Sequence, residues 1–110
     1  MEASAKGDIV LFPFPYTDLT HRKIRPCLIM SNEMGEDLIL CQITSKFKKD
    51  HYCIELRKEE TIRGSLLIDS YIRSNMLFTA IKSQIIKKLC EVSDQKYKEV
   101  ISSIAEIITK

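Results

Sequence analysis

The chain of 110 residues is 45% hydrophobic and 29% charged, and it contains three glycines and three prolines. This composition is typical of a single globular domain spanning residues 1–110, and it excludes a disordered or collagen-like chain. The formal net charge of +2 does not indicate polyanion binding by itself, and no apolar run approaches the roughly 18 residues of a membrane-spanning helix.

The N-terminal residues 1–6 include no apolar segment of the kind found in signal peptides. We therefore expect a frayed start to the domain and a cytoplasmic protein that does not enter the membrane. The first strand is predicted at Ile9–Phe12, closed by Pro13 and Pro15, because proline lacks the N–H that a strand interior uses.

A long basic loop separates this strand from a second, continuous apolar strand predicted at Cys27–Met30. Arg25 and Pro26 stand directly before the second strand, and a proline favours extended backbone in the residue that precedes it. Arg25 is therefore expected at the mouth of a strand, where its guanidinium group can bind a phosphate through two parallel hydrogen bonds.

The third strand is predicted at Asp37–Thr44. Alternate residues of a strand share a face, and one face here changes from apolar to polar along the strand, in the order Leu38, Leu40, Gln42 and Thr44. Either the strand becomes polar simply because it leaves the core, or Gln42 and Thr44 line a wet groove together with Ser45 and Lys46.

Two further strands are predicted, at His51–Leu56 and around Ser70–Phe78, with a polar connection at 57–61 and the apolar run Leu66–Ile68 between them. The second of these strands carries several polar side chains: Ser70, Arg73, Ser74 and Asn75. Because buried polar groups need partners, these side chains either lie at an exposed strand end or serve a site.

The hydrophobic period changes near the C-terminus. After Ser93, a suitable N-cap, apolar residues recur with the spacing of one amphipathic helix: Tyr97, Val100, Ile101, Ile104, Ile107 and Ile108. The preceding segment Lys82–Val92 fits either a short helix or a strand at Leu89–Val92. This order of elements predicts mainly β structure with a C-terminal helix, as a small, strongly curved sheet or barrel with helical cover.

Positive charge gathers in two clusters at the ends of predicted strands. The first comprises His21, Arg22, Lys23 and Arg25, and the second comprises Lys46, Lys48 and Lys49. Each cluster alone is explained equally well by a solvated loop, but two basic loops that open toward one polar strand end favour a common anion site. Histidine can serve as an acid or a base near neutral pH, although the loop positions of His21 and His51 are typical of ordinary surface histidines.

The four cysteines lie in apolar or alternating runs without a C-x-x-C spacing, at Cys27, Cys41, Cys53 and Cys90. Buried, reduced thiols are the interpretation that fits this pattern, and we expect neither a metal ion nor another cofactor. The sequence also lacks the P-loop, G-x-S-x-G and H-E-x-x-H motifs.

Several short motifs follow one another along nearly the whole chain, from Lys6 to the C-terminal helix. In order they are Gly7-Asp8-Ile9-Val10, FPFPYTDL at 12–19, Arg25-Pro26 before Cys27-Leu28-Ile29, Gln42-Ile43-Thr44-Ser45, and Thr79, Lys82 and Ile85-Ile86. No single motif is diagnostic, but their order and spacing together resemble the MazF/PemK toxins of type II toxin–antitoxin systems.

The resemblance implies a compact SH3-like β-barrel of the PemK/CcdB type that works as a homodimer. Members of the family are metal-independent endoribonucleases, or mRNA interferases, that cut single-stranded RNA at short sequences. Their products carry 2′,3′-cyclic phosphate and 5′-hydroxyl ends, and a cognate antitoxin peptide blocks the groove. Contact with operator DNA is expected only through the antitoxin.

By motif, Arg25 and Thr44 match residues assigned to catalysis in the family. Attack by a 2′-hydroxyl builds negative charge on the phosphate, which a guanidinium fork and a hydroxyl donor stabilise without a metal ion. Arg25 is expected to stabilise charge rather than act as a base, because a guanidinium pKa above about 12 makes deprotonation costly. The other expected RNA-binding residues are Lys23, Gln42, Ser45, Lys46, Ser70 and Arg73.

The chain also departs from the family pattern. Phe78 stands where an arginine is common. In the PemK-like branch, an arginine and an aspartate of this strand are implicated in cleavage; Arg73 matches the arginine, but Asn75 replaces the aspartate and cannot accept a proton. Arg25 and Thr44 are therefore the preferred pair.

Two other functions are considered. The departures from the family pattern keep open a catalytically silent nucleic-acid-binding or regulatory barrel that acts with an antitoxin. A gyrase poison of the CcdB type shares the fold but is disfavoured, because such toxins use a terminal Trp-Gly-Ile, whereas this chain has no tryptophan and ends in Ile108-Thr109-Lys110.

Overall fold

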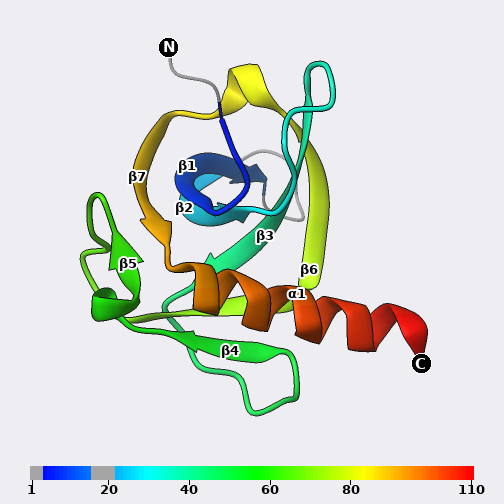
Figure 1. The fold of residues 1–110 in the computed structure, drawn as a ribbon. Helices are drawn as coiled ribbons and strands as arrows, with labels where there is room; N and C mark the ends of the chain where they lie inside the picture. The colour runs from blue at the N-terminus through cyan, green and yellow to red at the C-terminus, as the bar shows by residue number, and fades with distance from the viewer. Residues whose placement is uncertain (1–3, 16–21) are drawn as a thin grey trace.

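The computed structural model describes residues 4–15 and 22–110. In this part of the chain, seven strands form one antiparallel sheet that curls into a half-barrel, and one helix packs across its end (Figure 1). The strands are β1 (Asp8–Pro15), β2 (Arg22–Ile29), β3 (Asp37–Thr44), β4 (Cys53–Leu56), β5 (Thr61–Ile62), β6 (Ser70–Ile81) and β7 (Lys87–Val92). Their order in the sheet is β4-β6-β3-β2-β1-β7-β5, and the helix is α1 (Asp94–Thr109). The predicted mainly β fold is confirmed, whereas the predictions for His21 and for the first three residues fall outside the described range.

Strand β1 runs through both prolines that were predicted to end it. The carbonyl oxygen of Leu11 accepts a hydrogen bond from the N–H of Ile86. The backbone N–H and C=O groups of Leu11 therefore point away from β2. Pro13 and Pro15 lie two and four residues further and point the same way, beyond the last β1–β7 pair at Leu11. Their missing N–H groups therefore face a free edge, where proline is tolerated.

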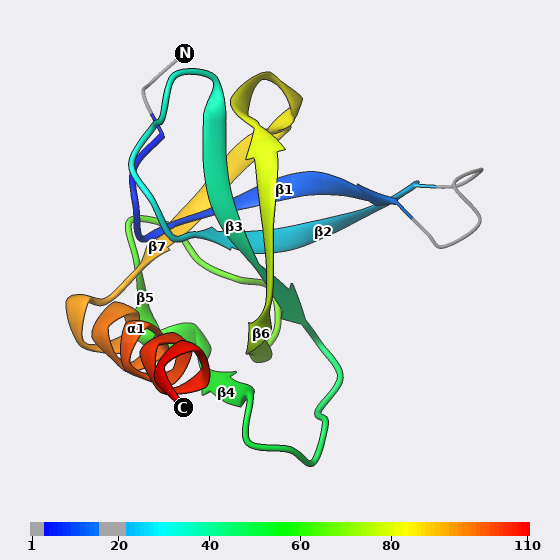
Figure 2. The same cartoon turned by 90° about the vertical axis from the view of Figure 1, so that its right-hand side faces the viewer.

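Strand β2 begins earlier than predicted, because it pairs with β1 from Ile9–Leu28 as far as Pro15–Arg22. The two strands form a ribbon that projects beyond the rest of the sheet (Figure 2). The expected extended backbone at Arg25 is present, but the residue lies inside a strand and not at the predicted strand mouth.

Strand β3 has the predicted bounds and is buried on both faces by two apolar clusters. Leu38 and Leu40 pack with residues of β1 and β2, whereas Cys41 and Ile43 pack with residues of β4, β6, β7 and α1. The curl of the sheet produces this arrangement, since a flat sheet with one helix would cover only one face.

Strand β6 pairs with β3 on both sides of a marked irregularity. Leu77 pairs with Cys41 of β3 and Ile72 pairs with Ile43, so four residues of β6 stand opposite the single residue Gln42. At this irregularity the strand bends and its first half pairs with β4. The bend brings the loop between β3 and β4 (residues 45–52) against Arg73.

The C-terminal helix begins as predicted. The Ser93 hydroxyl accepts a hydrogen bond from the N–H of Lys96 at 3.2 Å, and Val100 is fully buried. Tyr97 donates its hydroxyl to the carbonyl oxygen of Met30 at 2.8 Å, which fixes the helix on the sheet. Among the described residues, no helix has the length and apolar character needed to cross a membrane.

Three segments remain: residues 82–92, the fourth strand and the connection that follows it. Of the two alternatives for 82–92, the strand holds, preceded by one 3₁₀ turn at Lys82–Gln84. The fourth strand is shorter than predicted because residues 51 and 52 belong to the preceding turn. The polar connection after β4 contains a 3₁₀ turn at Lys58–Glu60 and the two-residue strand β5, which is too short to leave a periodic pattern in the sequence.

Candidate functional site

A groove opens where β2 and β3 part. Their pairing runs from Ile29–Leu40 to Cys27–Gln42, and beyond that point β2 continues with β1 alone. The groove has a volume of about 360 Å³. It is lined by Leu11, Lys23, Ile24, Arg25, Pro26, Ile43, Thr44, Ser45, Leu66, Leu67, Ile68, Ser70 and Leu89. Five of the eight predicted site residues therefore border one hollow.

The strand register separates the polar and the apolar residues at this groove. Lys23 and Arg25 share a face of the sheet with Gln42 and Thr44, because paired residues of neighbouring strands point the same way. This face continues the cluster of Leu38 and Leu40, so the predicted change from apolar to polar along β3 is present.

Thr44 is the last residue of β3 and is half-buried. Its Oγ1 accepts a hydrogen bond from the N–H of Lys46 at 3.2 Å. Because this contact uses a lone pair of the oxygen, the hydroxyl proton can still be donated to an anion. Ser45, which lines the groove, and Lys46 follow and are both exposed.

Ser70 borders the groove at the start of β6. Its side chain is buried, and its hydroxyl donates to the carbonyl oxygen of Ile68 at 3.1 Å. Asp69 accepts a hydrogen bond from the N–H of Lys58 at 2.9 Å, and a Cβ at Gly64 would lie against the carbonyl oxygen of Leu89. These contacts fix the segment 65–69 as one wall of the groove.

The apolar rim of the groove was not expected as part of a site. The side chains of Leu67, Ile68 and Ile24 are 94%, 57% and 55% exposed beside the polar residues. In the sequence, the run Leu66–Ile68 indicates only the approach to a strand. Its position between Gly64 and the polar start of β6 is the signal that marks it as a loop wall.

Arg73 does not border the groove. Its side chain is 9% exposed, and its Nη1 donates to both carboxylate oxygens of Asp50, at 2.9 and 2.8 Å. Burial opposes ionisation of both partners, but the pair lowers the pKa of the Asp50 carboxyl and raises that of the Arg73 guanidinium. Both groups are therefore charged over the whole ordinary pH range.

The two departures from the family pattern have different surroundings. The centroid of the Phe78 ring lies 5.6 Å from that of Phe12 and 4.9 Å from that of Phe14. Phe78 therefore adds to the apolar core, where an arginine would add charge. Asn75 is exposed in the irregular part of β6.

The cysteines behave as the sequence indicates. Cys27, Cys41 and Cys90 are buried free thiols, and Cys53 is a half-buried free thiol. Burial raises the pKa of Cys27 and Cys41 to about 12 and that of Cys90 to about 11, so these three stay protonated and unreactive. Within residues 4–15 and 22–110, no three His, Cys, Asp or Glu side chains lie close enough to share a metal ion.

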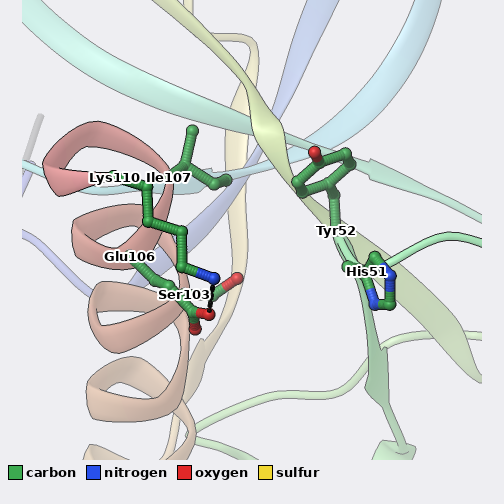
Figure 3. A pocket seen from close by; sticks show the side chains of 6 residues that line it. All are labelled: His51, Tyr52, Ser103, Glu106, Ile107 and Lys110. Carbon is green, nitrogen blue, oxygen red and sulfur yellow. Dashed lines mark ion pairs between the residues drawn. The ribbon is translucent and has the colours of Figure 1, made fainter.

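A second hollow, of about 500 Å³, lies between the last turns of α1 and the start of β4 (Figure 3). It is lined by His51, Tyr52, Ser103, Glu106, Ile107 and Lys110. Lys110 and Glu106 form an exposed ion pair of 2.7 Å along the helix that makes one of its walls. None of the residues predicted for RNA binding or catalysis lines this hollow, and His51 lies here rather than beside Arg25 and Thr44.

Comparison with known proteins places the chain in context. A family model described as "PemK-like, MazF-like toxin of type II toxin-antitoxin system" matches residues 5–108. No curated protein sequence matches the chain at a significant level.

Three solved structures resemble it. A chain of the MazE–MazF complex (form III) from Deinococcus radiodurans has a TM-score of 0.80 at 15% identity, over 98% of each chain. An endoribonuclease in complex with its cognate antitoxin from a mycobacterial species has a TM-score of 0.75 at 16% identity, over 97% of this chain and 96% of that one. The Mycobacterium tuberculosis toxin MazF-mt6 has a TM-score of 0.73 at 13% identity, over 93% and 96%. At these identities the likeness establishes the shared fold.

Proposed function

The chain belongs to the PemK-like, MazF-like toxins of type II toxin–antitoxin systems, and on this basis we propose that it is an endoribonuclease toxin inhibited by a cognate antitoxin. The observation that carries the proposal is the placement of Lys23, Arg25 and Thr44 on one face of the sheet beside a groove. The substrate is single-stranded RNA, cut at a short recognition sequence.

The proposed reaction needs only the groups of the groove. The 2′-oxygen of a ribose attacks the adjacent phosphorus, and the bond from phosphorus to O5′ breaks. The proton released by the 2′-hydroxyl is balanced by the one that O5′ takes up, which leaves a 2′,3′-cyclic phosphate and a 5′-hydroxyl. Arg25 stabilises the charge on the phosphate oxygens, and Thr44 donates its free hydroxyl proton to the same group.

The surroundings of these two residues support the assignment. Arg25 is held in extended backbone by its pairing with Phe12 in the β1–β2 ribbon, so little backbone reorganisation is needed when charge develops. Lys23 and Lys46 are exposed near the groove and are proposed to bind flanking phosphates, with Gln42, Ser45 and Ser70 at the same groove or face.

The proposed partners are an antitoxin peptide and a second copy of the chain. Two of the similar structures contain an antitoxin, which supports the first. Large apolar side chains remain exposed on α1 and β6, including Ile101, Ile108 and Leu77, which supports the second. Any contact with operator DNA is proposed to run through the antitoxin.

The decisive experiment is cleavage of a long single-stranded RNA by the purified chain in excess EDTA, beside the variant Thr44→Ala. We expect site-specific fragments with cyclic phosphate ends from the unaltered chain and a strong loss of cleavage in the variant. Thr109→Ala, an exposed threonine at the end of α1, serves as the control. Intact RNA from a folded chain would instead favour the silent, regulatory barrel.

A further inference from the structure

The loop between β3 and β4, residues 45–52, carries the second basic cluster and is tied down at both ends. At its start, the N–H of Lys46 donates to the Thr44 hydroxyl. At its end, Asp50 binds the buried guanidinium of Arg73. The lysines between these two points, at 46, 48 and 49, are exposed.

The attachment at the end of the loop is a small hydrogen-bond network around the Asp50 carboxylate. Its Oδ1 also accepts the N–H of Tyr52 at 2.9 Å, and the carbonyl oxygen of Tyr52 accepts both the N–H and the hydroxyl of Ser74. Arg73 and Ser74 stand at the bend of β6, where the first half of this strand pairs with both β3 and β4, so the loop is attached to the interior of the sheet. The middle of the loop is also held, because the ring of Phe47 packs edge-on against Tyr71 at 5.5 Å.

Arg73 is poorly placed to bind RNA itself. Its guanidinium is almost fully buried and already holds a carboxylate with two short hydrogen bonds. Exchanging that partner for a phosphate would leave the Asp50 charge without its cation, which is costly for a partly buried group. The ion pair therefore serves to attach the loop to β6, and the Arg73 charge is not available to bind a phosphate.

We infer that Asp50 and Arg73 are positioning residues that fix the basic loop 45–52 beside the groove, so that its lysines bind the phosphates of the RNA. This inference rests on the proposed function, and it adds a role for Asp50 and changes that of Arg73. A fixed loop contributes to affinity because its ordering cost is met before the RNA binds. The chemical step at Arg25 and Thr44 is not expected to depend on it.

The two roles of Arg73 predict opposite effects at Asp50. If Arg73 only positions the loop, Asp50→Ala and Arg73→Ala have the same effect, and the double variant is no worse than either. If Arg73 binds RNA directly, Asp50→Ala releases its guanidinium and leaves RNA binding equal to or tighter than that of the unaltered chain.

The test measures single-turnover cleavage of a labelled RNA by the two single variants and the double variant. We expect each to raise KM about tenfold with kcat within about threefold, because several interactions between the loop and the RNA phosphates weaken together. The slope of log K against log salt should fall in magnitude by about 0.7 for each phosphate that the loop no longer neutralises. Asp50→Glu should recover part of the affinity.

The experiment needs a control ion pair of similar exposure that lies away from the loop. Glu33→Ala is the control, because it removes an ion pair with Lys82 near the other end of β3. The Glu33 side chain is 28% exposed, as is that of Asp50, and its loss should leave KM unchanged. If Asp50→Ala does not fold, Asp50→Asn keeps the contact with Tyr52 and is measured in its place. Unchanged or tighter RNA binding by the Asp50 variant, or a fall in kcat alone, overturns the inference while the proposed function stands. If the unaltered chain neither binds nor cuts RNA, the proposed function fails and the inference with it.

Discussion

Arg25 presents its guanidinium from the middle of a strand. Phe12 on the neighbouring strand pairs with it and is buried, so the backbone that carries Arg25 is fixed by both hydrogen bonds and packing. A group that must stabilise charge in a transition state gains most when it is already in place. This position distinguishes Arg25 from Arg73, whose charge is held by Asp50.

For Arg25 we predict that Arg25→Ala lowers kcat by roughly 10²–10³ while the fold is retained. Arg25→Lys keeps the charge but loses the planar fork, so it should recover only part of this rate. Single-turnover cleavage gives the rates, and circular dichroism checks that each variant is folded. An Arg25→Ala variant with normal kcat would remove Arg25 from the mechanism.

How far the site could be predicted depends on sequence distance. Gln42 and Thr44 fall on one face because strand periodicity is visible within eight residues, and the structure agrees. The partner of Arg73 lies 23 residues away in a loop, and no local pattern connects the two. The wall at 65–69 could not be predicted for the same reason, because its contacts are with Lys58 and Leu89.

At the level of elements, period-2 patterns and the helical stripe predicted most strands and α1. The largest error lies at the β1–β2 ribbon, where Pro13 and Pro15 suggested an end. A proline blocks a strand only when its missing N–H faces a partner, and which side it faces depends on the register with β2 and β7. That register is tertiary information.

The junction of α1 with the turn before β5 depends on one buried lysine. Lys96 is 7% exposed, and its ammonium lies 3.0 Å from Glu60 and 2.8 Å from Glu99. Burial opposes ionisation of Glu60, but the N–H of Arg57 and the Lys96 ammonium outweigh it and lower the pKa of this carboxyl below its ordinary 4.5. The folded state therefore binds protons less readily at Glu60 than the unfolded state does.

A depressed carboxyl pKa contributes stability that is present above the unfolded value and is lost as the pH falls through the folded value. We therefore predict that the free energy of unfolding decreases from about pH 4.5 downward, and that Glu60→Gln shows a shallower decrease and lower stability at pH 7. Urea denaturation at several pH values measures this. Glu59→Gln, on the exposed neighbouring residue, should follow the unaltered chain; identical curves for both variants would contradict the assignment.

The molecule as a whole is compact, but it leaves large apolar side chains on its surface. The radius of gyration is 13.2 Å, close to the value of about 13 Å for a compact domain of this length. Yet large apolar side chains stay exposed on one stripe of α1, at Ile101 and Ile108, and at Leu77 of β6. Because the domain is already compact, rearrangement within one chain would not cover them, and a second copy is the proposed cover. The sequence shows this stripe as apolar, but it cannot show that no strand of the same chain covers it.

We predict a dimer at micromolar concentration, and a shift to monomer when a lysine replaces an exposed apolar side chain of the α1 stripe, by Ile108→Lys, or of β6, by Leu77→Lys. An unpaired ammonium buried between two copies costs several kcal/mol, which raises the dissociation constant by at least about 100-fold. Sedimentation velocity over a range of concentrations measures the shift. Met34→Lys replaces a side chain that is 49% exposed in the turn before β3, outside the stripe, and should leave the dimer intact. A wild-type chain that sediments as a monomer at micromolar concentration would refute the dimer, and a Met34→Lys variant as monomeric as Ile108→Lys would place the contact elsewhere on the surface.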